Sequence, residues 1–175
     1  GIIEHVTQTD YSAFGIRKDH AALVKGKAGS PYAIKDYYDV DPDLAENVAD
    51  RMNEFQQLVQ RTHKAGMKVI IDFVPNHVAR EYYSDAKPDG VKDLGETDHP
   101  EWHFSPLNNF YYISGQPFQP QFDVQGYAEF PAKATGNDQF TPSPTVNDWY
   151  ETVKLNYGVN YTEGRQLQFS PIPDT

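Results

Sequence analysis

The sequence contains no cysteine, which excludes disulfide bonds and thiolate metal sites and leaves the redox compartment undetermined. Basic residues are few, since 15 Lys and Arg stand against 25 Asp and Glu, for a formal net charge of -10. Such an acidic chain is disfavoured as a partner of nucleic acid or anionic membranes, because that binding needs basic patches. No apolar run reaches the length of a transmembrane helix. Neutral ligands are not disfavoured in this way.

Aromatic residues are abundant, with 12 Tyr, 10 Phe and 2 Trp, and many of them follow residue 100. We favour the interpretation that they anchor long loops without regular structure. The alternative is a surface of rings that stack on sugars. The 175 residues suffice for one domain with a core, and both ends of the sequence resemble cuts from a longer chain.

Residues 43–65 show a helical pattern. Apolar side chains recur three and four positions apart and form one stripe: Val48, Met52, Phe55, Val59 and Thr62, with Leu58 beside them. Asp43 is a plausible N-cap, and Glu46 stands where a capping box needs it. Gly66 is placed at the position after the helix where a positive φ is favourable. The pattern predicts a helix whose apolar stripe faces a sheet.

Residues 67–74 are nearly all apolar and rich in β-branched side chains, which is typical of a parallel strand covered on both faces. Pro75 ends this predicted strand, and Asn76 and His77 follow at once. Asp72 lies near the end of the strand, where a buried carboxylate needs partners. Polar groups beyond the carboxyl end of a strand are where α/β folds place their sites.

Three segments carry a family resemblance. Residues 68–77, KVIIDFVPNH, resemble the first conserved motif of the α-amylase superfamily, glycoside hydrolase family 13, in which D-x-x-x-N-H follows a barrel strand. Residues 30–38, SPYAIKDYY, resemble the segment of that family between strand two and helix two. Residues 154–157, KLNY, are similar to a short P-D-L-N-type motif late in domain B, although Lys154 replaces the usual acidic residue.

The resemblance implies an α/β fold: a partial (β/α)8-barrel segment followed by an irregular, loop-rich domain B with short strands. Residues 1–78 would be the barrel segment, and residues 79–175 the domain B-like insertion. Residues 43–74 would be the second helix and third strand. One clear strand is too few for a closed barrel, which needs eight strands and typically ~250 residues.

The resemblance also implies sugar contacts. His77 matches the family histidine that hydrogen-bonds the sugar beside the scissile bond, and Tyr32 matches the tyrosine that stacks on that sugar. An imidazole can donate to a hydroxyl, and an aromatic face packs well on a pyranose. The alternatives are a structural histidine under a loop and ordinary packing of the tyrosine.

The remaining site residues are expected to support the active site rather than to react. Asp72 and Asp36 match hydrogen-bonding carboxylates that order its floor. Asn76 matches the asparagine that holds a structural calcium between barrel and domain B, and an amide oxygen suits that hard cation. The alternative for Asn76 is a side chain that stabilises its own turn.

Two further groups of charged residues are not expected to form a functional site. Arg80 and Glu81 are expected to form a surface pair, which would contribute little to stability. Residues 98–103, DHPEWH, resemble a metal cluster, but Pro100 prevents a helix that would align the two histidines. A metal site is therefore not expected there.

Retaining glycosidases need two carboxyl groups about 5 Å apart, a nucleophile and an acid/base. The family carries its nucleophile in a Gly-x-Arg-x-Asp segment, and we expect no such segment in this sequence. The nucleophile, the acid/base and a third Asp are therefore expected outside this chain. The resemblance implies a parent enzyme that hydrolyses α-1,4-glucosidic bonds of α-glucans, such as starch and maltooligosaccharides, with retention. The chain alone is expected to be inactive.

Two alternatives remain, a non-catalytic α-glucan-binding module and a scaffold that kept the family shape without the chemistry. An incomplete barrel would leave strand edges exposed, so we expect either self-association of the chain or its presence within a larger folded protein. The sequence does not determine localisation, for which an extracellular or periplasmic site is a guess.

Overall fold

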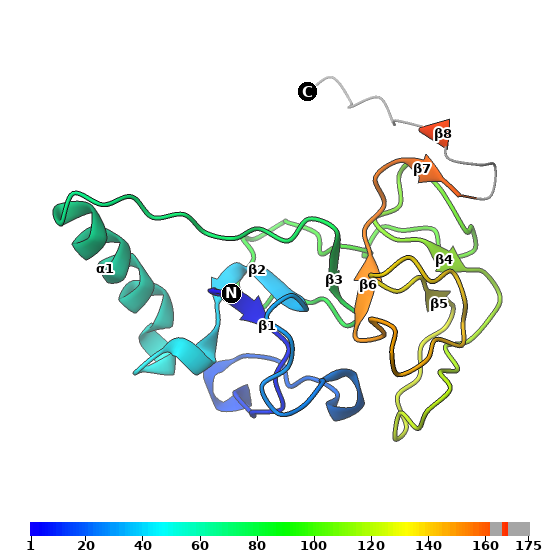
Figure 1. Cartoon of the computed structure of the whole chain (residues 1–175), viewed down its shortest axis with the longest axis horizontal. Helices are drawn as coiled ribbons and strands as arrows, with labels where there is room; N and C mark the ends of the chain where they lie inside the picture. Colours follow the sequence, from blue (N-terminus) through cyan, green and yellow to red (C-terminus); the bar gives the residue numbers. More distant parts are fainter. Residues whose placement is uncertain (162–165, 168–175) are drawn as a thin grey trace. The chain divides into compact units, whose positions relative to one another are not determined.

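The structure is a computed structural model that describes residues 1–161 and 166–167 (Figure 1). The chain forms two compact units, Gly1–Val91 and Lys92–Thr175, and each is described by itself. The described residues contain one α-helix and several short strands, which confirms a mixture of helix and strand but not a barrel segment, and they form no closed barrel. That helix is too short and too polar to cross a membrane. The predicted boundary after residue 78 falls inside the first unit, and a domain B at 79–175 stays a prediction.

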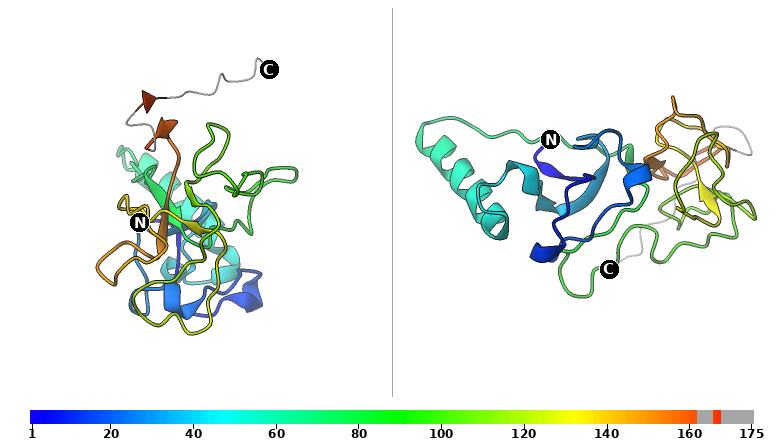
Figure 2. Two further views of the ribbon diagram at one scale, coloured as in Figure 1. Left: turned by 90° about the vertical axis from the view of Figure 1, so that its right-hand side faces the viewer. Right: turned by 90° about the horizontal axis from the view of Figure 1, so that it is seen from below.

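The first unit contains a pair of antiparallel strands, β1 (Ile3–His5) and β2 (Ile34–Val40). Their register sets Glu4 opposite Asp36, with irregularities on either side of Glu4. A third short strand, β3 (His77–Ala79), lies against β2 (Figure 2). Residues 6–33 join β1 to β2 through two short 3₁₀ helices, Ser12–Phe14 and Ala21–Leu23.

A small apolar core holds these strands together. It consists of four buried side chains: Val6, Val24, Ala33 and Ala79. Gly29 closes this core with a left-handed φ of +71°, and a Cβ atom there would lie 1.8 Å from the carbonyl oxygen of Val6. The close approach of two backbone segments therefore requires glycine at position 29.

The helix α1 spans Arg51–Lys64 and begins later than the predicted N-cap at Asp43. Two 3₁₀ helices, Pro42–Leu44 and Val48–Asp50, take up the intervening residues. The capping box predicted with Glu46 is wrong, because the carboxylate of Glu54 accepts the backbone N–H groups of Glu46 at 2.9 Å and of Asn47 at 2.8 Å. Glu54 thus satisfies two backbone N–H groups that precede the helix, and Glu46 does not act as a capping residue.

The predicted end of α1, just before Gly66, is confirmed. Gly66 adopts a φ of +77°. Its N–H donates to His63 O at 2.9 Å, while Met67 N–H donates to Thr62 O at 3.1 Å. This pair of bonds is the Schellman motif, which satisfies carbonyl groups that the helix leaves open.

The predicted strand at residues 67–74 is wrong. The segment runs extended from the end of α1 toward β3 without ladder partners, and Ile70 is 94% exposed (Figure 1). The apolar stripe of α1 is not buried either, since none of the residues of the helix is buried. A parallel strand needs a neighbour on each edge and cover on each face, and the described part of the first unit supplies neither.

The second unit is loop-rich, as expected for residues beyond 91. It contains β4 (Tyr112–Ile113) paired antiparallel with β5 (Ala132–Lys133), then β6 (Thr152–Lys154), and β7 (Val159–Asn160) paired antiparallel with β8 (Gln166–Leu167). Isolated bridges join Phe110 to Leu155 and Thr135 to Val153.

Aromatic packing holds the loops of the second unit. Tyr111 is fully buried, and its ring meets four other rings at centroid distances from 5.4 to 6.2 Å: those of His103, Phe104, Phe140 and Tyr161. Its hydroxyl donates to Val159 O at 2.9 Å. The anchoring role expected for the aromatic residues is confirmed for this cluster, although Trp102 and Trp149 stay exposed.

Replacing Gly29 by alanine should destabilise the chain by several kcal/mol, because a Cβ at this position would collide with the backbone of residue 6. Gly26→Ala is the matched control, since Gly26 has a similar φ of +68° and open space around it. That control should cost about 1 kcal/mol. Urea unfolding of both variants measures the difference, and equal losses would contradict the close approach at position 29.

Candidate active-site support in the first unit

Asn76 and His77 lie side by side at the start of β3. The amide Nδ2 of Asn76 donates to Nδ1 of His77 at 3.0 Å, and the imidazole is buried. Because the amide nitrogen can only donate, Nδ1 accepts and the neutral ring carries its proton on Nε2. The structure therefore brings these two predicted site residues together.

Asp36 is completely buried within β2. Its Oδ1 accepts the N–H of Tyr38 at 2.7 Å, and its Oδ2 accepts the N–H of Ala86 at 3.2 Å. The carboxylate thus ties β2 to the chain beyond β3. The neighbouring Tyr37 hydroxyl donates to the carbonyl of Val74, so β2 also holds the end of the extended segment. A position for Asp36 in the floor of a site is consistent with these bonds.

Tyr32 and Asp72 are not joined to this group. Tyr32 lies in the turn before β2 with 56% of its surface exposed, and its backbone N–H donates to Ser30 Oγ at 3.3 Å. Asp72 is exposed in the extended segment, and its carboxylate has no hydrogen bond or ion pair within the described residues. The predicted burial of Asp72 is wrong, because burial depended on a strand that does not form. Its supporting role stays a prediction.

Sequence reasoning missed a buried group of charges beside Asp36. The ammonium group of Lys35 lies 3.0 Å from Asp19 Oδ1 and 3.6 Å from Glu4 Oε1, and it donates to the carbonyl of Arg17. Asp19 also accepts the N–H of Thr7 at 2.9 Å. The sequence did carry a signal for this group, namely charged side chains that alternate with apolar ones in short extended segments.

Glu4 is the poorer partner of Lys35, because its Oε2 is buried without a hydrogen bond. Burial raises the pKa of Glu4 from 4.5 to about 8; Lys35 opposes the shift, while nearby Asp36, Asp39 and Asp19 add to it. The carboxyl group is then neutral at pH 7, so Asp19 carries the ion pair with Lys35. The 3.6 Å contact between Lys35 and Glu4 is a contact with a protonated acid.

Residues 15–19, GIRKD, match the Gly-x-Arg-x-Asp spacing, so the prediction that the sequence contains no such segment is wrong. Asp19 of this segment is buried against Lys35 in the loop between β1 and β2. The segment precedes the D-x-x-x-N-H motif, whereas the family nucleophile is expected after it. Asp19 therefore acts here as a structural partner of Lys35.

Other ion pairs lie in the first unit. His5 Nδ1 pairs with the buried carboxylate of Asp41; burial opposes protonation of the ring, but the hydrogen bond and charge of Asp41 outweigh it and raise the pKa of His5. The predicted surface pair of Arg80 and Glu81 is wrong. Arg80 is only 1% exposed, and Glu81 lies 3.6 Å from Arg17.

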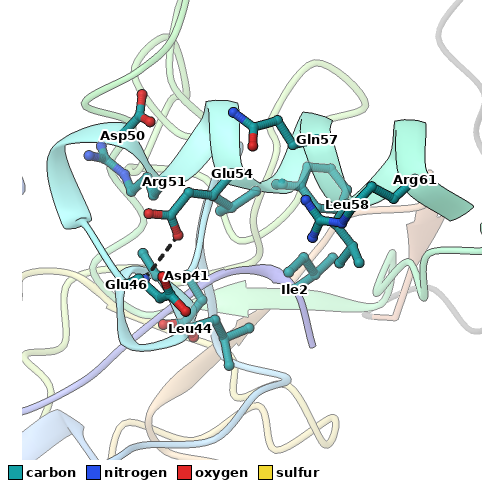
Figure 3. A pocket seen from close by; sticks show the side chains of 13 residues that line it. Ile2, Asp41, Leu44, Glu46, Asp50, Arg51, Glu54, Gln57, Leu58 and Arg61 are labelled. Carbon is teal, nitrogen blue, oxygen red and sulfur yellow. Dashed lines mark hydrogen bonds between the residues drawn. The ribbon is translucent and has the colours of Figure 1, made fainter.

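An open groove of about 760 Å³ runs along α1 in the first unit (Figure 3). Apolar side chains line it, including Ile2, Leu44, Phe55 and Leu58. Charged residues are present as well, among them Glu54 and Arg61, and none of the five predicted site residues lines the groove. It lies beside Phe55 and Leu58 of the apolar stripe rather than at the expected sugar site.

The KLNY segment has a structural role in the second unit. The amide of Asn156 donates to Ser105 O at 2.8 Å and to Asn108 O at 2.9 Å, and its Oδ1 accepts the N–H of Gly158 at 2.8 Å. Lys154 pairs with Asp138 at 2.8 Å. Asn156 therefore holds the loop at residues 105–109 in place.

The DHPEWH segment is used for hydrogen bonding. The carboxylate of Asp98 accepts the N–H groups of Asn109 at 2.7 Å and Phe110 at 3.0 Å and the hydroxyl of Tyr112 at 2.9 Å. Burial, together with the charge and hydrogen bond of Asp98, raises the pKa of Tyr112. The ring of His99 stacks on Trp102, and that of His103 contacts Tyr112 O at 2.8 Å.

Calcium would need six to eight oxygen ligands, often from carboxylates. Over the described residues no group of three or more His, Asp or Glu side chains is placed to hold a metal ion. Asn76 offers one amide oxygen, and its nitrogen is engaged with His77. The residues around Asn76 therefore do not fit a carboxylate-rich calcium site by themselves, and calcium stays a prediction.

Comparison with protein families decides the assignment. The family model described as alpha amylase, catalytic domain, matches residues 20–142, which is more than half of the chain. The chain belongs to the alpha-amylase family. The match includes both the Tyr32–Asp36 segment and the D-x-x-x-N-H motif, so the resemblance inferred from these residues is confirmed.

Similar proteins in the alpha-amylase family carry several names. An alpha-amylase of Streptomyces lividans is 26% identical over 148 residues, which is 83% of this chain and 13% of that protein. The amino acid transporter heavy chain SLC3A1 of Rattus norvegicus is 30% identical over 104 residues, 54% of this chain and 14% of that protein. Maltase 1 of Drosophila virilis is 34% identical over 67 residues, 36% of this chain and 10% of that protein. No solved structure matches the chain.

The stability of the chain should fall as pH rises from about 5 to about 9. Over this range Glu4 of the folded chain keeps a proton that Glu4 of the unfolded chain has lost. Because the pKa of Glu4 is raised from 4.5 to about 8, its contribution is complete below 4.5 and is lost as pH passes 8. The difference in unfolding free energy between wild type and Glu4→Gln should therefore shrink with pH by several kcal/mol. Parallel pH profiles of the two proteins in urea unfolding would contradict the shift.

Asn156→Asp should destabilise the second unit by about 3 kcal/mol, because a carboxylate would face two backbone carbonyl oxygens in place of an amide donor. Asn147→Asp is the control, since Asn147 is exposed and its replacement adds the same negative charge to this unit. Thermal unfolding followed by the near-UV signal of the aromatic cluster measures both. Equal stability of the two variants would mean that Asn156 does not hold residues 105–109.

Proposed function

We propose that this chain is part of an alpha-amylase-type glycoside hydrolase that cleaves α-1,4-glucosidic bonds of α-glucans with retention. The observation that carries the proposal is the hydrogen-bonded Asn76–His77 pair, which is the second half of the D-x-x-x-N-H motif. The names alpha-amylase and maltase among its relatives support the same substrate class. The chain spans about a seventh or less of those relatives, so the activity belongs to the longer protein.

In this proposal residues 1–78 are a partial (β/α)8-barrel segment and residues 79–175 are a domain B-like insertion. His77 donates from Nε2 to a hydroxyl of the sugar beside the scissile bond, a hydrogen bond that can strengthen in the transition state. Tyr32 is exposed enough to stack on that sugar. Asp36 and Asp72 support the floor, and Asn76 sets the tautomer of His77, or holds calcium when other ligands are present.

The reacting carboxylates are proposed to lie outside this chain. The buried acids described above are engaged in other ways: Asp19 pairs with Lys35, and Asp36 accepts two backbone N–H groups. Double displacement needs a nucleophile and an acid/base facing the same bond about 5 Å apart. We therefore propose that the chain binds one side of the substrate and leaves bond cleavage to residues supplied by the rest of the protein.

The purified chain incubated with maltoheptaose should release no new reducing ends above a buffer control. The protein translated from the longest open reading frame that contains the chain should release them at an ordinary enzyme rate. Turnover by the 175-residue chain alone would overturn the assignment of the reacting carboxylates to the longer protein.

In that longer protein, His77→Ala should lower kcat/KM for maltoheptaose by about tenfold or more, because a hydrogen bond made in the transition state is lost. Tyr32→Ala should also lower kcat/KM, whereas Tyr32→Phe keeps the stacking face. Tyr38→Ala is the control, since Tyr38 is an exposed tyrosine of the same segment outside the proposed contact. His77 is buried here, as a purely structural histidine would be, and that alternative predicts lost stability with unchanged kcat/KM.

A second candidate is a scaffold that keeps the family shape without its chemistry. The observation that favours it is the similarity to SLC3A1, whose name describes an amino acid transporter heavy chain. The longer protein decides between these two candidates. A longer protein that folds but shows no turnover, and that lacks carboxylates after barrel strands four and five, would support the scaffold. Calorimetry with maltoheptaose tests the third alternative, a glycan-binding module, and weak or no binding is expected for the isolated chain.

A further inference from the structure

Lys35 and Asp19 carry the two groups from which an amide bond is made, an amine and a carboxyl group. The Nζ atom of Lys35 lies 3.0 Å from Oδ1 of Asp19, and the two side chains are only 3% and 5% exposed. Groups held at such a distance, away from bulk water, react as parts of one molecule, which raises their effective concentration by orders of magnitude. Burial thus supplies the proximity that the same two groups lack in solution.

A buried ion pair also favours condensation on thermodynamic grounds. The attraction between two buried charges offsets only part of the free energy that is lost when they leave water. An amide between Lys35 and Asp19 would replace both charges by one neutral group. Burial raises the pKa of Asp19, against the opposing effect of Lys35. Transfer of a proton from the ammonium group to this carboxylate is therefore easier than in water.

Glu4 stands beside the reacting nitrogen. Its Oε1 lies 3.6 Å from Nζ of Lys35, and its Oε2 is buried without a hydrogen bond. Burial raises the pKa of Glu4 to about 8, so its carboxyl group carries a proton at pH 7. A neutral carboxyl group can accept a proton on one oxygen and give one from the other. The three side chains therefore combine a nucleophile, an acceptor and a proton carrier.

We propose that Lys35 and Asp19 join spontaneously in an isopeptide bond, with Glu4 as the proton shuttle. The bond would link β2 to the loop that precedes it, and Tyr32 lies within the ring that it closes. The protein would then be lighter than its sequence by the mass of one water molecule. The proposal does not depend on the proposed glycosidase function.

The reaction balances without a further reactant. The ammonium group of Lys35 passes a proton to Oδ1 of Asp19, and the lone pair left on Nζ faces the same carboxyl group. Attack forms the Nζ–Cγ bond and moves the π electrons of the carbonyl group to Oδ2. This atom accepts the N–H of Thr7 at 2.9 Å, which stabilises the negative charge. Glu4 takes a proton from the nitrogen on Oε1 and gives one from Oε2 to the Oδ1 hydroxyl, so that the Cγ–Oδ1 bond breaks and water leaves.

The charge of Lys35 disappears in the product, with a consequence for Glu4. In the ion pair, Lys35 is the group that opposes the raised pKa of Glu4. Once Lys35 is an amide, that opposition is gone and Glu4 stays protonated. The shuttle therefore ends the reaction in the state in which it began.

A tryptic digest of the longer protein that contains this chain tests the bond. Trypsin does not cleave after an acylated lysine, so mass spectrometry should find residues 19–25 joined to residues 28–51, with the loss of one water. Complete cleavage after Lys35, with residues 19–25 unlinked, would overturn the proposal. A link from Lys35 to Glu4 or Asp36 would also overturn it.

Two nearly isosteric variants test the roles of the side chains. Lys35→Arg keeps the positive charge but replaces the amine by a guanidinium group that stays protonated, so residues 19–25 should be released unlinked. Glu4→Gln removes the proton shuttle and should lower the linked fraction at least tenfold. A linked fraction in Glu4→Gln equal to that of the wild type would overturn the role of Glu4. The wild-type digest decides on the bond itself even where a variant fails to fold.

Lys154 and Asp138 are the matched internal control. Their charged groups lie 2.8 Å apart and Lys154 is buried, but Asp138 is 55% exposed. Water has access to this pair, so trypsin should cleave after Lys154 in the ordinary way. A linked fraction at Lys154 equal to that at Lys35 would contradict the requirement for burial on which the proposal rests.

The exposed Asp89–Gly90 sequence provides a second control, because an aspartate before glycine can also lose water by closing a succinimide ring. That loss would lie within residues 81–92 of the digest and would persist in Lys35→Arg. The isopeptide bond predicts a loss that disappears in this variant. A loss of water confined to residues 81–92 would overturn the proposal.

Discussion

The first unit depends on the buried ammonium group of Lys35. Its side chain joins β2 to Asp19 and to the carbonyl of Arg17, and it lies beside Glu4 on β1. Its own carbonyl accepts the N–H of Tyr83, so the chain beyond β3 is bound to the same residue. A buried cation is costly unless it is paired, and the loop between the two strands folds back to supply its partners.

The candidate site rests on that arrangement. Asp36 follows Lys35 in β2 and is buried by the same packing, which lets its carboxylate bind the backbone of Ala86. The Asn76–His77 pair begins the neighbouring strand. The chain thus places the buried carboxylate of Asp36 and the hydrogen-bonded Asn76–His77 pair on neighbouring strands.

The end of the helix was predictable from the sequence, whereas its start and the features that need distant partners were not. The Schellman motif at Gly66 depends only on the helix beside it. The strand at residues 67–74 failed because a strand is a property of its neighbours, and Asp72 lost its burial with it. The group around Lys35 also escaped prediction, because ion pairs between residues far apart in the sequence leave no periodic pattern. For the candidate site, motif spacing singled out His77 and Asp36 but did not predict the bonds that hold them, and their roles at a sugar site stay predictions.

The bonds made by Asn156 have a consequence for the order of folding. This residue closes contacts with residues 48 and 51 positions earlier in the chain, and the Tyr111 hydroxyl reaches 48 positions ahead. Contacts of such long sequence separation form slowly, because the loop entropy is lost before the bonds are gained. During synthesis the aromatic cluster therefore stays incompletely packed until residues 156–161 have left the ribosome. The second unit is exposed to chaperones and proteases for longer than its size alone would suggest.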